Sequence, residues 1–462
     1  MSIKTRFCPS PTGFMHLGNA RTALFSALAV KVHDTFLLRI EDTDIERSEE
    51  RYTEALKEDL QWLGCQWNEG PGCEIPGHGP YEQSQRLSIY QQYYDELQQK
   101  GMAYPCYCTP EELDASRKRQ SRMGKPPRYA GTCKHLTQAP EDRAPTLRFA
   151  MPENKVIEFD DIVRGHQCFQ ADDIGDFIIR KADGMATFMF CNAIDDSLMG
   201  VTLALRGEDH LTNTPRQLII LEALGLPAPQ YGHISLILGE DGTPLSKRNG
   251  SRSIRELREQ GYLPLAIVNY LARLGHVYTD HNHLMSFTDC SQYFSLTHLV
   301  KAPARYDQHQ LNHWQKEVVL ALSMDEYHDW VKNADLSLVP HDKKESFLST
   351  IRPNVLFSGD VNMWAEHLFS STSKLTEENK TILKEAGDAF LVAAIHALHT
   401  VATYQELCAA LKEKLGVSGK KLFMPLRVAM SQQMHGPELA ALFDLLGKEK
   451  LIQRFEELRT VL

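Results

Sequence analysis

The first 70 residues alternate between short apolar runs and amphipathic stretches, a pattern that predicts strands alternating with helices. Residues 3–8 are β-prone and lead into a turn rich in Pro and Gly, whereas residues 36–40 form the nearly continuous apolar run of a buried parallel strand. Residues 19–30 have helical composition, and residues 48–63 have the spacing of a charged amphipathic helix. This start favours a doubly wound α/β domain with a parallel sheet.

The middle of the chain interrupts this α/β pattern. Residues 68–81 are rich in Gly and Pro and predict a loop. Apolar and polar residues alternate again at 185–206, so we expect the sheet to resume there and the intervening residues to be an insertion. The other predicted elements are helices over 84–100 and 214–225 and strands near 145–150, 155–163 and 177–180.

Beyond about residue 310, nearly every segment has helical spacing. Apolar side chains recur at i, i+3, i+4 and i+7 over residues 439–446, between Pro437, which suits a helix start, and Gly447, which suits a stop. The pattern predicts an all-α region at this end of the chain.

Composition excludes collagen-like, low-complexity and wholly disordered chains, because 42% of the residues are hydrophobic and 24% are charged. The 462 residues suffice for about three to four domains. We recognise no signal peptide and no apolar run of the roughly 18 residues that a membrane span requires. Ten unevenly spaced cysteines are too few for a disulfide scaffold, so we expect a cytoplasmic protein with reduced thiols.

Net charge argues at first against a nucleic-acid partner. The chain has 50 basic and 60 acidic residues, a net charge of −10, whereas proteins that coat nucleic acid are usually basic. The positive charge is nevertheless local, since residues 117–128 carry six basic residues and no acidic one. The acidic balance therefore excludes non-specific coating but not one specific polyanionic partner.

The turn after the first predicted strand is the first candidate for chemistry. His16 and Gly18 precede a predicted helix that starts near Asn19. Gly18 permits close approach of a nucleotide, the helix N-terminus offers free N–H groups to phosphate, and His16 can donate to a phosphate oxygen. In isolation, residues 16–19 would be an ordinary strand-to-helix turn.

A second candidate is the basic turn at residues 242–250, G-T-P-L-S-K-R-N-G. The adjacent cations Lys247 and Arg248 suit the stabilisation of negative charge on a departing phosphate or pyrophosphate group. Flanking glycines permit movement. Alone, this segment would be an exposed basic turn.

A third candidate is the set Cys106, Cys108, Cys133 and His135. Three thiolates and one imidazole form a closed structural zinc set, although CxC is less common than CxxC among zinc sites. The alternative is two reduced cysteines in a turn beside two unrelated residues.

Together these segments resemble one family. Residues 16–19 are similar to the "HIGH" signature of class I aminoacyl-tRNA synthetases, and Leu245–Arg248 to the "KMSKS" loop in its K-L-S-K-R form. The wider opening RFCPSPTGFMHLGNARTALF resembles bacterial glutamyl-tRNA synthetases, and the resemblance extends from Arg6 to about Glu457. Some members carry a similar CxC…CxH set.

The resemblance implies a fold and a reaction. The fold is a Rossmann-like α/β catalytic domain with an inserted acceptor-binding domain, followed by an α-helical anticodon-binding region. In the reaction, the α-carboxylate of L-glutamate attacks ATP, which arrives with Mg²⁺, and the resulting adenylate transfers its acyl group to the 3′ end of tRNA. Zn²⁺ is structural, the enzyme is expected to be a monomer, and family members generally need bound tRNA before they activate glutamate.

The resemblance also assigns residues to roles. His16, Lys247 and Arg248 are the expected catalytic residues. The residues expected at ATP are His16, Gly18, Asn19, Glu208, Ser246 and Lys247. The residues expected at glutamate are Arg6, Ser10, Glu41, Asn192 and Arg206, where Arg6 and Arg206 suit carboxylates and Glu41 ends a predicted strand. Taken singly, each would be a surface salt-bridge partner.

Three positions depart from the family pattern. Cys8 replaces Ala, and we expect a reactive thiol near the site. Phe188 replaces Tyr and removes a hydroxyl near the substrate, and Pro244 replaces the first Lys of the loop, where we expect altered stiffness rather than lost activity.

The expected domains follow the same pattern. They are a catalytic domain at 1–82 and 186–240, an acceptor-stem-binding insertion with the zinc site at 83–185, a stem-contact segment at 241–315 and the helical anticodon-binding region at 316–462. Within that region, residues 418–438 resemble a family stretch in which Lys420, Lys421 and Arg427 suit phosphate contacts.

Several alternatives remain open. The acceptor is tRNA(Glu), tRNA(Gln) or both, and the residues that read the anticodon are not evident. A truncated paralogue that modifies a tRNA base lacks the helical third, and a glutaminyl enzyme usually has a Pro-Glu-Pro-Asn-Gly turn and β-barrels. A non-catalytic zinc-stabilised RNA-binding module explains residues 106–135 but leaves both ATP signatures without a role.

Overall fold

The computed structural model describes residues 2–44, 46–124, 126–136, 138–140, 142–245, 252–279, 282–370 and 375–461. The chain divides into two compact units. Unit 1 comprises Met1–Glu259 and Leu263–Leu311, and unit 2 comprises Gln260–Tyr262 and Asn312–Leu462. We describe each unit by itself.

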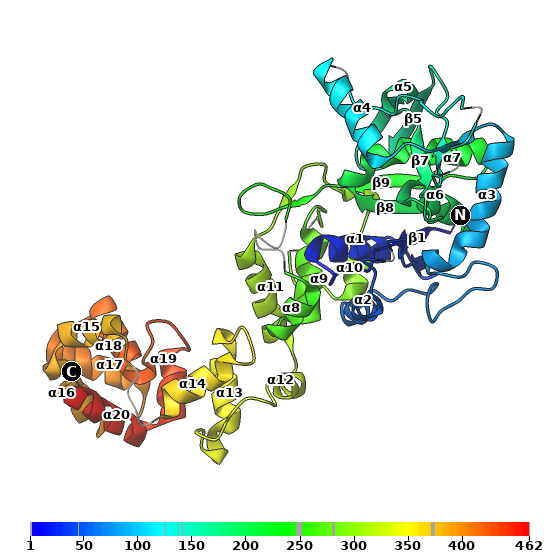
Figure 1. Cartoon of the computed structure of the whole chain (residues 1–462). Helices are drawn as coiled ribbons and strands as arrows, with labels where there is room; N and C mark the ends of the chain where they lie inside the picture. Colours follow the sequence, from blue (N-terminus) through cyan, green and yellow to red (C-terminus); the bar gives the residue numbers. More distant parts are fainter. Residues whose placement is uncertain are drawn as a thin grey trace. The chain divides into compact units, whose positions relative to one another are not determined.

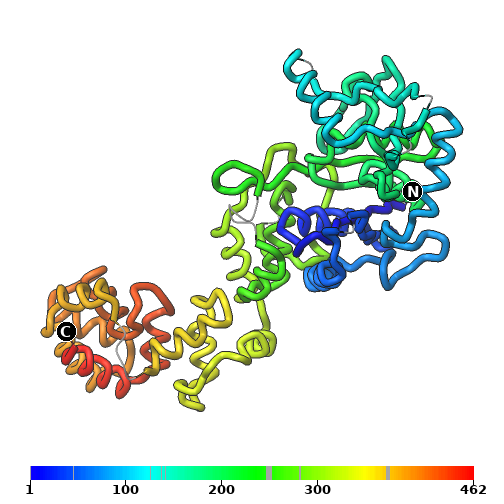
Figure 2. Tube along the Cα trace, viewed as in Figure 1, coloured from blue at the N-terminus to red at the C-terminus, as the bar shows by residue number. Residues whose placement is uncertain are grey.

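A four-stranded parallel sheet forms the centre of unit 1 (Figure 1). Its strands, in spatial order, are β2 (Thr35–Leu38), β1 (Lys4–Phe7), β8 (Leu203–Gly207) and β9 (Gln230–Ile234). The N-terminal strand therefore lies beside a strand about 200 residues later in the chain, and the two traces run side by side in Figure 2. A parallel sheet of this kind confirms the predicted α/β class.

Helices cover this sheet. Helix α1 (Leu17–Leu28) packs against β1, β8 and α9 (Pro264–Arg273), and α6 (Phe188–Leu198) packs against α7 (Thr214–Leu224). Helix α2 (Glu50–Trp62) follows β2. The apolar runs and amphipathic stretches at the start of the chain thus form the predicted strands and helices.

The sheet resumes within residues 185–206, as predicted, but only at β8, because Phe188–Leu198 is helix α6. Every residue from Phe190 to Ser197 is buried, so this helix has no solvent face to produce a period of 3.6. A helix buried on all sides cannot be distinguished from a strand by periodicity alone.

The residues between β2 and β8 form smaller sheets beside the parallel one. These are an antiparallel sheet of β3 (Ala103–Cys106), β4 (Thr146–Phe149) and β7 (Phe177–Arg180), and a hairpin of β5 (Val156–Asp161) and β6 (Gly165–Gln170). The remaining elements are η1 (Gln83–Arg86), α3 (Leu87–Gln99), α4 (Pro110–Arg122) and α5 (Ala171–Ile174).

This segment shares its hydrophobic core with the helices that follow it. Tyr90, Leu147 and Phe149 belong to one buried cluster with Phe190 and Ile220. Polar groups add to the connection: Gln83, Arg86 and Tyr90 all donate to the buried carboxylate of Asp195 on α6, at 2.7–2.8 Å. Packing and buried hydrogen bonds therefore join the segment to the α/β core.

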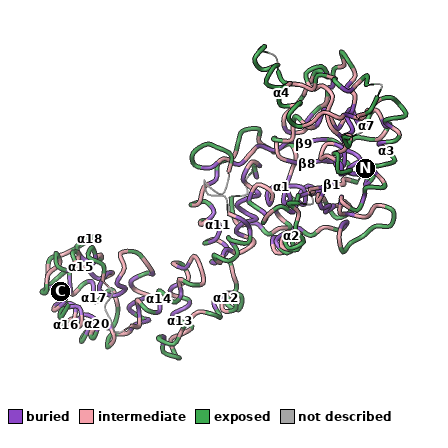
Figure 3. Tube along the Cα trace, viewed as in Figure 1, coloured by how far each residue is buried: buried purple, intermediate pink, exposed green. Residues whose placement is uncertain are grey.

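The rest of unit 1 follows β9. Strand β10 (Ile237–Leu238) pairs with β11 (Ala304–Arg305), and the helical elements are η2 (Glu208–Asn213), α8 (Ile254–Glu259), α9, α10 (Phe287–Tyr293) and η4 (Leu296–His298). Figure 3 shows the contrast within this unit: the central strands are mostly buried, whereas α4 has no buried residue.

From Gln308 onward, every element that the structure describes is helical, as predicted. The α-helices are α11 (Gln308–Ala321), α12 (Met324–Trp330), α13 (Lys344–Ile351), α14 (Asp360–Phe369), α15 (Glu377–Ala386), α16 (Asp388–Leu398), α17 (Tyr404–Leu415), α18 (Lys420–Ser431), α19 (Leu439–Leu446) and α20 (Lys448–Val461). Helix α19 ends at Gly447 with φ 78°, the stop predicted from the sequence. None of the described helices has both the length and the apolarity that a membrane span requires.

Candidate active site and zinc site

A cavity of about 480 Å³ lies at the carboxyl ends of β1 and β8, where ligands of open α/β sheets bind. Its lining comes from the turn after β1, the start of α1, helix α6 and the end of β8. The predicted residues that line it are Arg6, Ser10, His16, Gly18, Asn19, Glu41, Asn192 and Arg206. Tertiary structure therefore brings together eight residues that the sequence spreads over 201 positions.

His16 is the N-cap of α1. Its Nδ1 accepts hydrogen bonds from the backbone N–H groups of Gly18, at 3.1 Å, and Asn19, at 3.4 Å. Because Nδ1 accepts, the ring proton is on Nε2, which leaves Nε2–H as the donor for a ligand. Desolvation lowers the pKa of His16, an effect that the charge of Asp209 opposes, so the imidazole is neutral near pH 7.

This cap corrects one expectation. The sequence predicted that the first N–H groups of the helix would be free for phosphate, but those of Gly18 and Asn19 donate to His16. The donor presented by this turn is instead the imidazole Nε2–H, together with the positive end of the helix dipole.

Arg6 is held by buried charges behind the cavity. Its Nε donates to both oxygens of Asp196, at 3.1 and 3.3 Å, and its Nη1 donates to the carbonyl of Leu205 at 3.0 Å. Arg39, which is fully buried, donates through Nη2 to Asp196 at 2.6 Å and to Asn192 Oδ1 at 2.9 Å. Two arginines thus share one carboxylate, and Asn192 keeps its amide NH₂ for other partners.

Glu41 and Asp209 are acidic residues of the cavity lining, and Glu41 is the one predicted at glutamate. Ser10 Oγ donates to its Oε2 at 3.0 Å. Burial raises the pKa of Glu41 to about 7, although the Ser10 hydrogen bond and the Arg39 charge oppose the shift. The carboxyl therefore changes charge near neutral pH, and a bound cation would favour its ionised form.

Three further lining residues change the picture given by the sequence. Burial raises the pKa of Cys8 to about 12, so this thiol is protonated near neutral pH and the expectation of a reactive cysteine was wrong. Phe188 does line the cavity, and its ring lies 4.9 Å from that of His210. His210 had no predicted role, although it stands in the same R-G-E-D-H box as Arg206.

Glu208, predicted at ATP, is not among the residues that line this cavity. It pairs with Arg164 of the β5–β6 turn, and its Oε1 accepts from the Leu236 N–H at 2.8 Å. Ser246, Lys247 and Arg248, the other residues predicted at ATP and pyrophosphate, lie outside the residues that the structure describes.

The predicted zinc set comes together only in part. The sulfur atoms of Cys106, Cys108 and Cys133 all lie within 4.8 Å of one another, and Cys108 Sγ is 3.7 Å from Cys133 Sγ. That separation matches the edge of a tetrahedron with Zn–S bonds of about 2.3 Å. His135 is exposed and is not part of this group.

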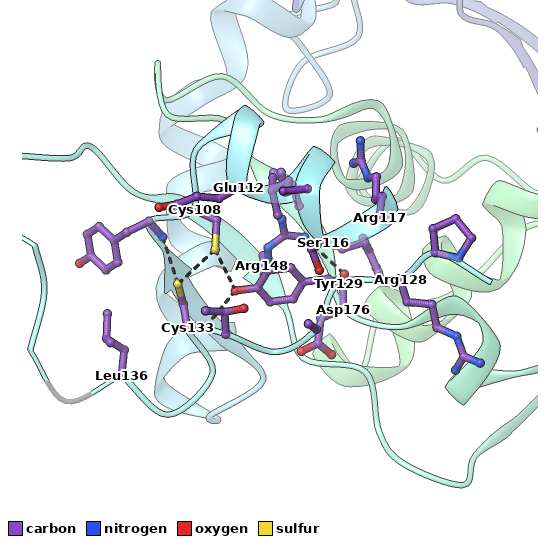
Figure 4. A pocket seen from close by; sticks show the side chains of 18 of the residues that line it. Cys108, Glu112, Ser116, Arg117, Arg128, Tyr129, Cys133, Leu136, Arg148 and Asp176 are labelled. Atoms are coloured by element: carbon purple, nitrogen blue, oxygen red, sulfur yellow. Dashed lines mark hydrogen bonds between the residues drawn. The ribbon is translucent and has the colours of Figure 1, made fainter. Parts of the chain in front are cut away.

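A different side chain lies beside the three thiols. The Tyr129 hydroxyl is 3.7 Å from Cys108 Sγ, and it accepts from the Cys133 N–H at 2.9 Å (Figure 4). It also lies 3.3 Å from Cys106 Sγ. The Arg148 guanidinium lies over the Tyr129 ring, 3.7 Å from its centroid. No zinc-ligand pattern in the sequence pointed to Tyr129, because a phenol is an uncommon zinc ligand.

The pKa values of the clustered thiols, Cys106 and Cys108, bear on cation binding. Burial alone would raise the pKa of Cys106, but hydrogen bonds from Tyr129 and Arg148 outweigh it and lower the pKa to about 7. Burial raises the pKa of Cys108 to about 11. A divalent metal deprotonates such thiols on binding, so the donor set of soft sulfur atoms fits Zn²⁺.

The cluster borders a larger cavity with many arginines. This cavity measures about 830 Å³ and reaches from α4 to Thr187 and Met189, which flank Phe188 of the first cavity. Its arginines are Arg117, Arg119, Arg128, Arg143, Arg148 and Arg216. The basic segment 117–128 belongs partly to α4, where Arg117, Lys118, Arg119 and Arg122 are exposed to solvent.

Unit 2 contains a cavity of about 410 Å³. It is lined by Tyr404, Lys420, Phe423, Met424, Arg427, Glu438, Leu439 and Ala440. The predicted residues Lys420 and Arg427 both line it, whereas Lys421 does not. Phe423, which the sequence did not single out, is 41% exposed there.

Comparisons with known proteins agree with this geometry. Residues 2–313 match the model of the class I tRNA synthetases (E and Q), catalytic domain, and residues 326–459 match an anticodon binding domain. The chain therefore belongs to the class I tRNA synthetase family designated E and Q, after the one-letter codes for glutamate and glutamine.

Similar proteins cover the whole chain. A glutamate–tRNA ligase 2 of Coxiella burnetii is 51% identical over 98% of this chain and 99% of its own length, and one of Nitrosococcus oceani is 51% identical over 98% of each. A crystal structure of a glutamate tRNA ligase from Elizabethkingia meningosepticum superposes with a TM-score of 0.85 at 28% identity and covers 100% of both chains.

Proposed function

We propose that the protein joins L-glutamate to the 3′ end of tRNA through a glutamyl adenylate. The observation that carries this proposal is one cavity whose lining combines the arginines Arg6, Arg21 and Arg206 with the acidic Glu41 and Asp209 and the capped helix start at His16. A dicarboxylic amino acid needs two cationic contacts and one anionic contact. The names of the relatives point to the same substrate.

In the first step, the α-carboxylate of glutamate attacks the α-phosphate of ATP. Arg6 and Arg206 hold the carboxylates, Glu41 takes the α-ammonium, and His16 Nε2–H donates to the phosphates. Mg²⁺ arrives with ATP and neutralises phosphate charge. Lys247 and Arg248 keep their predicted role at the departing pyrophosphate. No covalent enzyme intermediate is needed, so positioning and charge stabilisation supply the rate.

In the second step, the terminal ribose of tRNA attacks the adenylate. The cavity lined by arginines beside α4 is the proposed path of the acceptor end, because it combines exposed basic groups with residues that flank Phe188. We assign residues 83–185 to the acceptor stem, residues 241–315 to stem contacts and residues 316–462 to the anticodon. Lys420, Phe423 and Arg427 suit an unstacked base and its phosphate.

We propose tRNA(Glu) as the acceptor. None of the relatives reported above is named for glutamine, so the alternative acceptor tRNA(Gln) has no support from the comparisons. Likewise, the match of residues 326–459 to an anticodon binding domain argues against a truncated paralogue and a zinc module. The decisive assay is aminoacylation with purified tRNA(Glu) or tRNA(Gln) and with glutamate or glutamine; charging by glutamine alone would refute the proposal.

A structural Zn²⁺ at Cys106, Cys108 and Cys133 is a separate proposal, with the Tyr129 hydroxyl or His135 as the fourth ligand. Metal analysis of protein purified without chelator is expected to give one zinc per chain. Tyr129→Phe and His135→Ala separate the two candidates, because only loss of the true ligand lowers the zinc content. Wild-type protein without zinc would contradict the site.

A further inference from the structure

Arg206 is one of three arginines that line the first cavity, with Arg6 and Arg21. Its Nη2 donates to Thr214 Oγ1 at 2.8 Å, its Nε donates to His233 Nε2 at 3.0 Å, and its guanidinium lies over the Tyr231 ring, 4.9 Å from the centroid. The residue is 5% exposed, and Nη1 has no hydrogen-bond partner among the described residues. A buried guanidinium in a cavity wall, with one donor that no described residue accepts, can offer that donor to a ligand.

His233 fixes the Nε side of Arg206. The two residues are register partners on the neighbouring parallel strands β8 and β9. A guanidinium Nε–H can only donate, so His233 Nε2 must be the accepting nitrogen and Nδ1 must carry the proton. Burial lowers the pKa of His233, although Asp161 opposes the shift, so the neutral ring is favoured. Only this one tautomer of His233 fits Arg206.

Asp161 selects that tautomer. Its Oδ2 accepts from His233 Nδ1 at 2.5 Å, and both side chains are 0% exposed. Its Oδ1 accepts from the backbone N–H groups of Val163, Arg164 and His233, at 2.7–3.2 Å. Asp161 therefore stands rigidly at the end of β5, in a hairpin that lies between β2 and β8 in the sequence.

We propose that His233 and Asp161 are positioning residues that hold Arg206 with Nη1 directed at a carboxylate of the amino-acid substrate, and so set its affinity. They touch neither the substrate nor the reacting atoms. The proposal rests on the proposed function, because it takes glutamate as the ligand of the cavity. It further implies that the β5–β6 hairpin, which lies outside the parallel sheet, affects the affinity of the cavity for its substrate.

Two substitutions at one position separate orientation from packing. In His233→Asn, the amide NH₂ replaces Nδ1 and keeps the bond to Asp161, but Arg206 loses its acceptor. In His233→Gln, the longer side chain places its oxygen near the former Nε2 and keeps that acceptor. We expect His233→Asn to raise the KM for glutamate about 10- to 100-fold, and His233→Gln about threefold or less.

The readout is ATP–pyrophosphate exchange in the presence of tRNA, with separate titrations of glutamate and ATP. The KM for ATP is expected to stay within about twofold of wild type, because Arg206 does not bind ATP. Equal KM values for the Asn and Gln variants would overturn the proposal, and so would parallel rises for glutamate and ATP. Wild-type enzyme without glutamate-dependent exchange would instead refute the proposed function.

Asp161→Asn gives an independent test in case His233→Asn does not fold. Its amide NH₂ would face Nδ1, so His233 would adopt the other tautomer and present Nε2–H to Arg206. We expect the same selective rise in the KM for glutamate. The matched control is His276→Asn, at a buried histidine whose ring contacts Ser295 backbone atoms, and it should leave the ratio of the two KM values unchanged. An Asp161→Asn enzyme with the wild-type KM for glutamate would contradict the proposal.

Discussion

The cavity of the parallel sheet and the cavity of the helical unit present their arginines in different ways. In the first, Arg6 and Arg206 are almost fully buried, and each is held by further buried groups, Asp196 and His233. In the second, Phe423 is 41% exposed, and Arg427 donates through Nη1 to the Pro437 carbonyl at 2.8 Å. A small ligand offers few contacts, so the arginines that bind it must be held in place before it arrives. A polynucleotide offers many phosphates and stacked bases, so exposed side chains suffice.

The largest expected effect comes from removing the buried carboxylate behind the first cavity. Asp196→Ala leaves Arg6 and Arg39 without their shared carboxylate, so we expect a loss of about 3–5 kcal/mol in stability, visible as a lower Tm in thermal unfolding. Asp196→Asn, which keeps an acceptor for Arg39, should lose less. Glu54→Ala, at an exposed pair with Lys57 on α2, is the control and should not shift the Tm. A Tm equal to wild type in Asp196→Ala would refute the structural role of these charges.

A smaller effect is expected in the helical unit, where one buried charge performs a similar task. Arg454 on α20 donates to the carbonyls of His367, Leu368 and Met430, in the last turns of α14 and α18. Arg454→Met removes the donor to the Leu368 and Met430 carbonyls, while the His367 carbonyl still accepts from Gln432 Nε2 at 3.3 Å, so we expect a loss of about 2–3 kcal/mol. Unfolding should begin in unit 2, while exchange activity at low temperature persists.

The control for that prediction lies on the same helix. Arg459 is exposed and pairs with Asp388, so Arg459→Ala should leave the unfolding temperature of unit 2 unchanged. If Arg454→Met and Arg459→Ala behave alike, the buried carbonyl contacts do not stabilise this unit.

The pH dependence of glutamate binding tests the electrostatics of the first cavity. The pKa of Glu41 is raised to about 7 by burial, so the carboxyl is protonated below that pH and ionised above it. The α-ammonium of glutamate needs the ionised form. We therefore expect kcat/KM for glutamate to fall by up to about tenfold per pH unit below pH 7 and to level off above it.

Glu41→Gln provides the check on this assignment. The amide side chain of this variant does not ionise. The variant should therefore have a lower kcat/KM for glutamate than wild type at pH 8 and no break in the pH profile near pH 7. A break that persists in Glu41→Gln would assign the titration to another group.

The smallest expected effect concerns Phe188. Its ring lines the first cavity, where the family pattern has Tyr, so Phe188→Tyr adds one hydroxyl. One hydrogen bond is worth about 0.5–1.5 kcal/mol, which predicts a KM for glutamate about 2- to 10-fold lower. An unchanged KM in steady-state titrations would show that the hydroxyl finds no partner on glutamate.

Local patterns predicted most elements of the fold. The strands β1 and β2, helices α1 and α2 and the helical spacing near the end of the chain all follow from short-range periodicity. Helix α6 could not be separated from the strand after it, because its residues from Phe190 to Ser197 are all buried and no solvent-facing side reveals its period. The eight cavity residues could be predicted because each stands in a short motif, and the chemistry of phosphate and carboxylate restricts the residue types there.

The sequence by itself therefore determined the family, the reaction and eight of the residues that line the first cavity. Only the tertiary structure decided which groups hold those residues. Asp161, Arg206 and His233 stand in three separate segments: the 2.5 Å bond between Asp161 and His233 requires β5 beside β9, and the 3.0 Å bond between Arg206 and His233 requires β8 beside β9. The same holds for Tyr129, which lies beside three cysteines while His135 does not. Side-chain direction depends on packing between distant elements, and no local spacing records it.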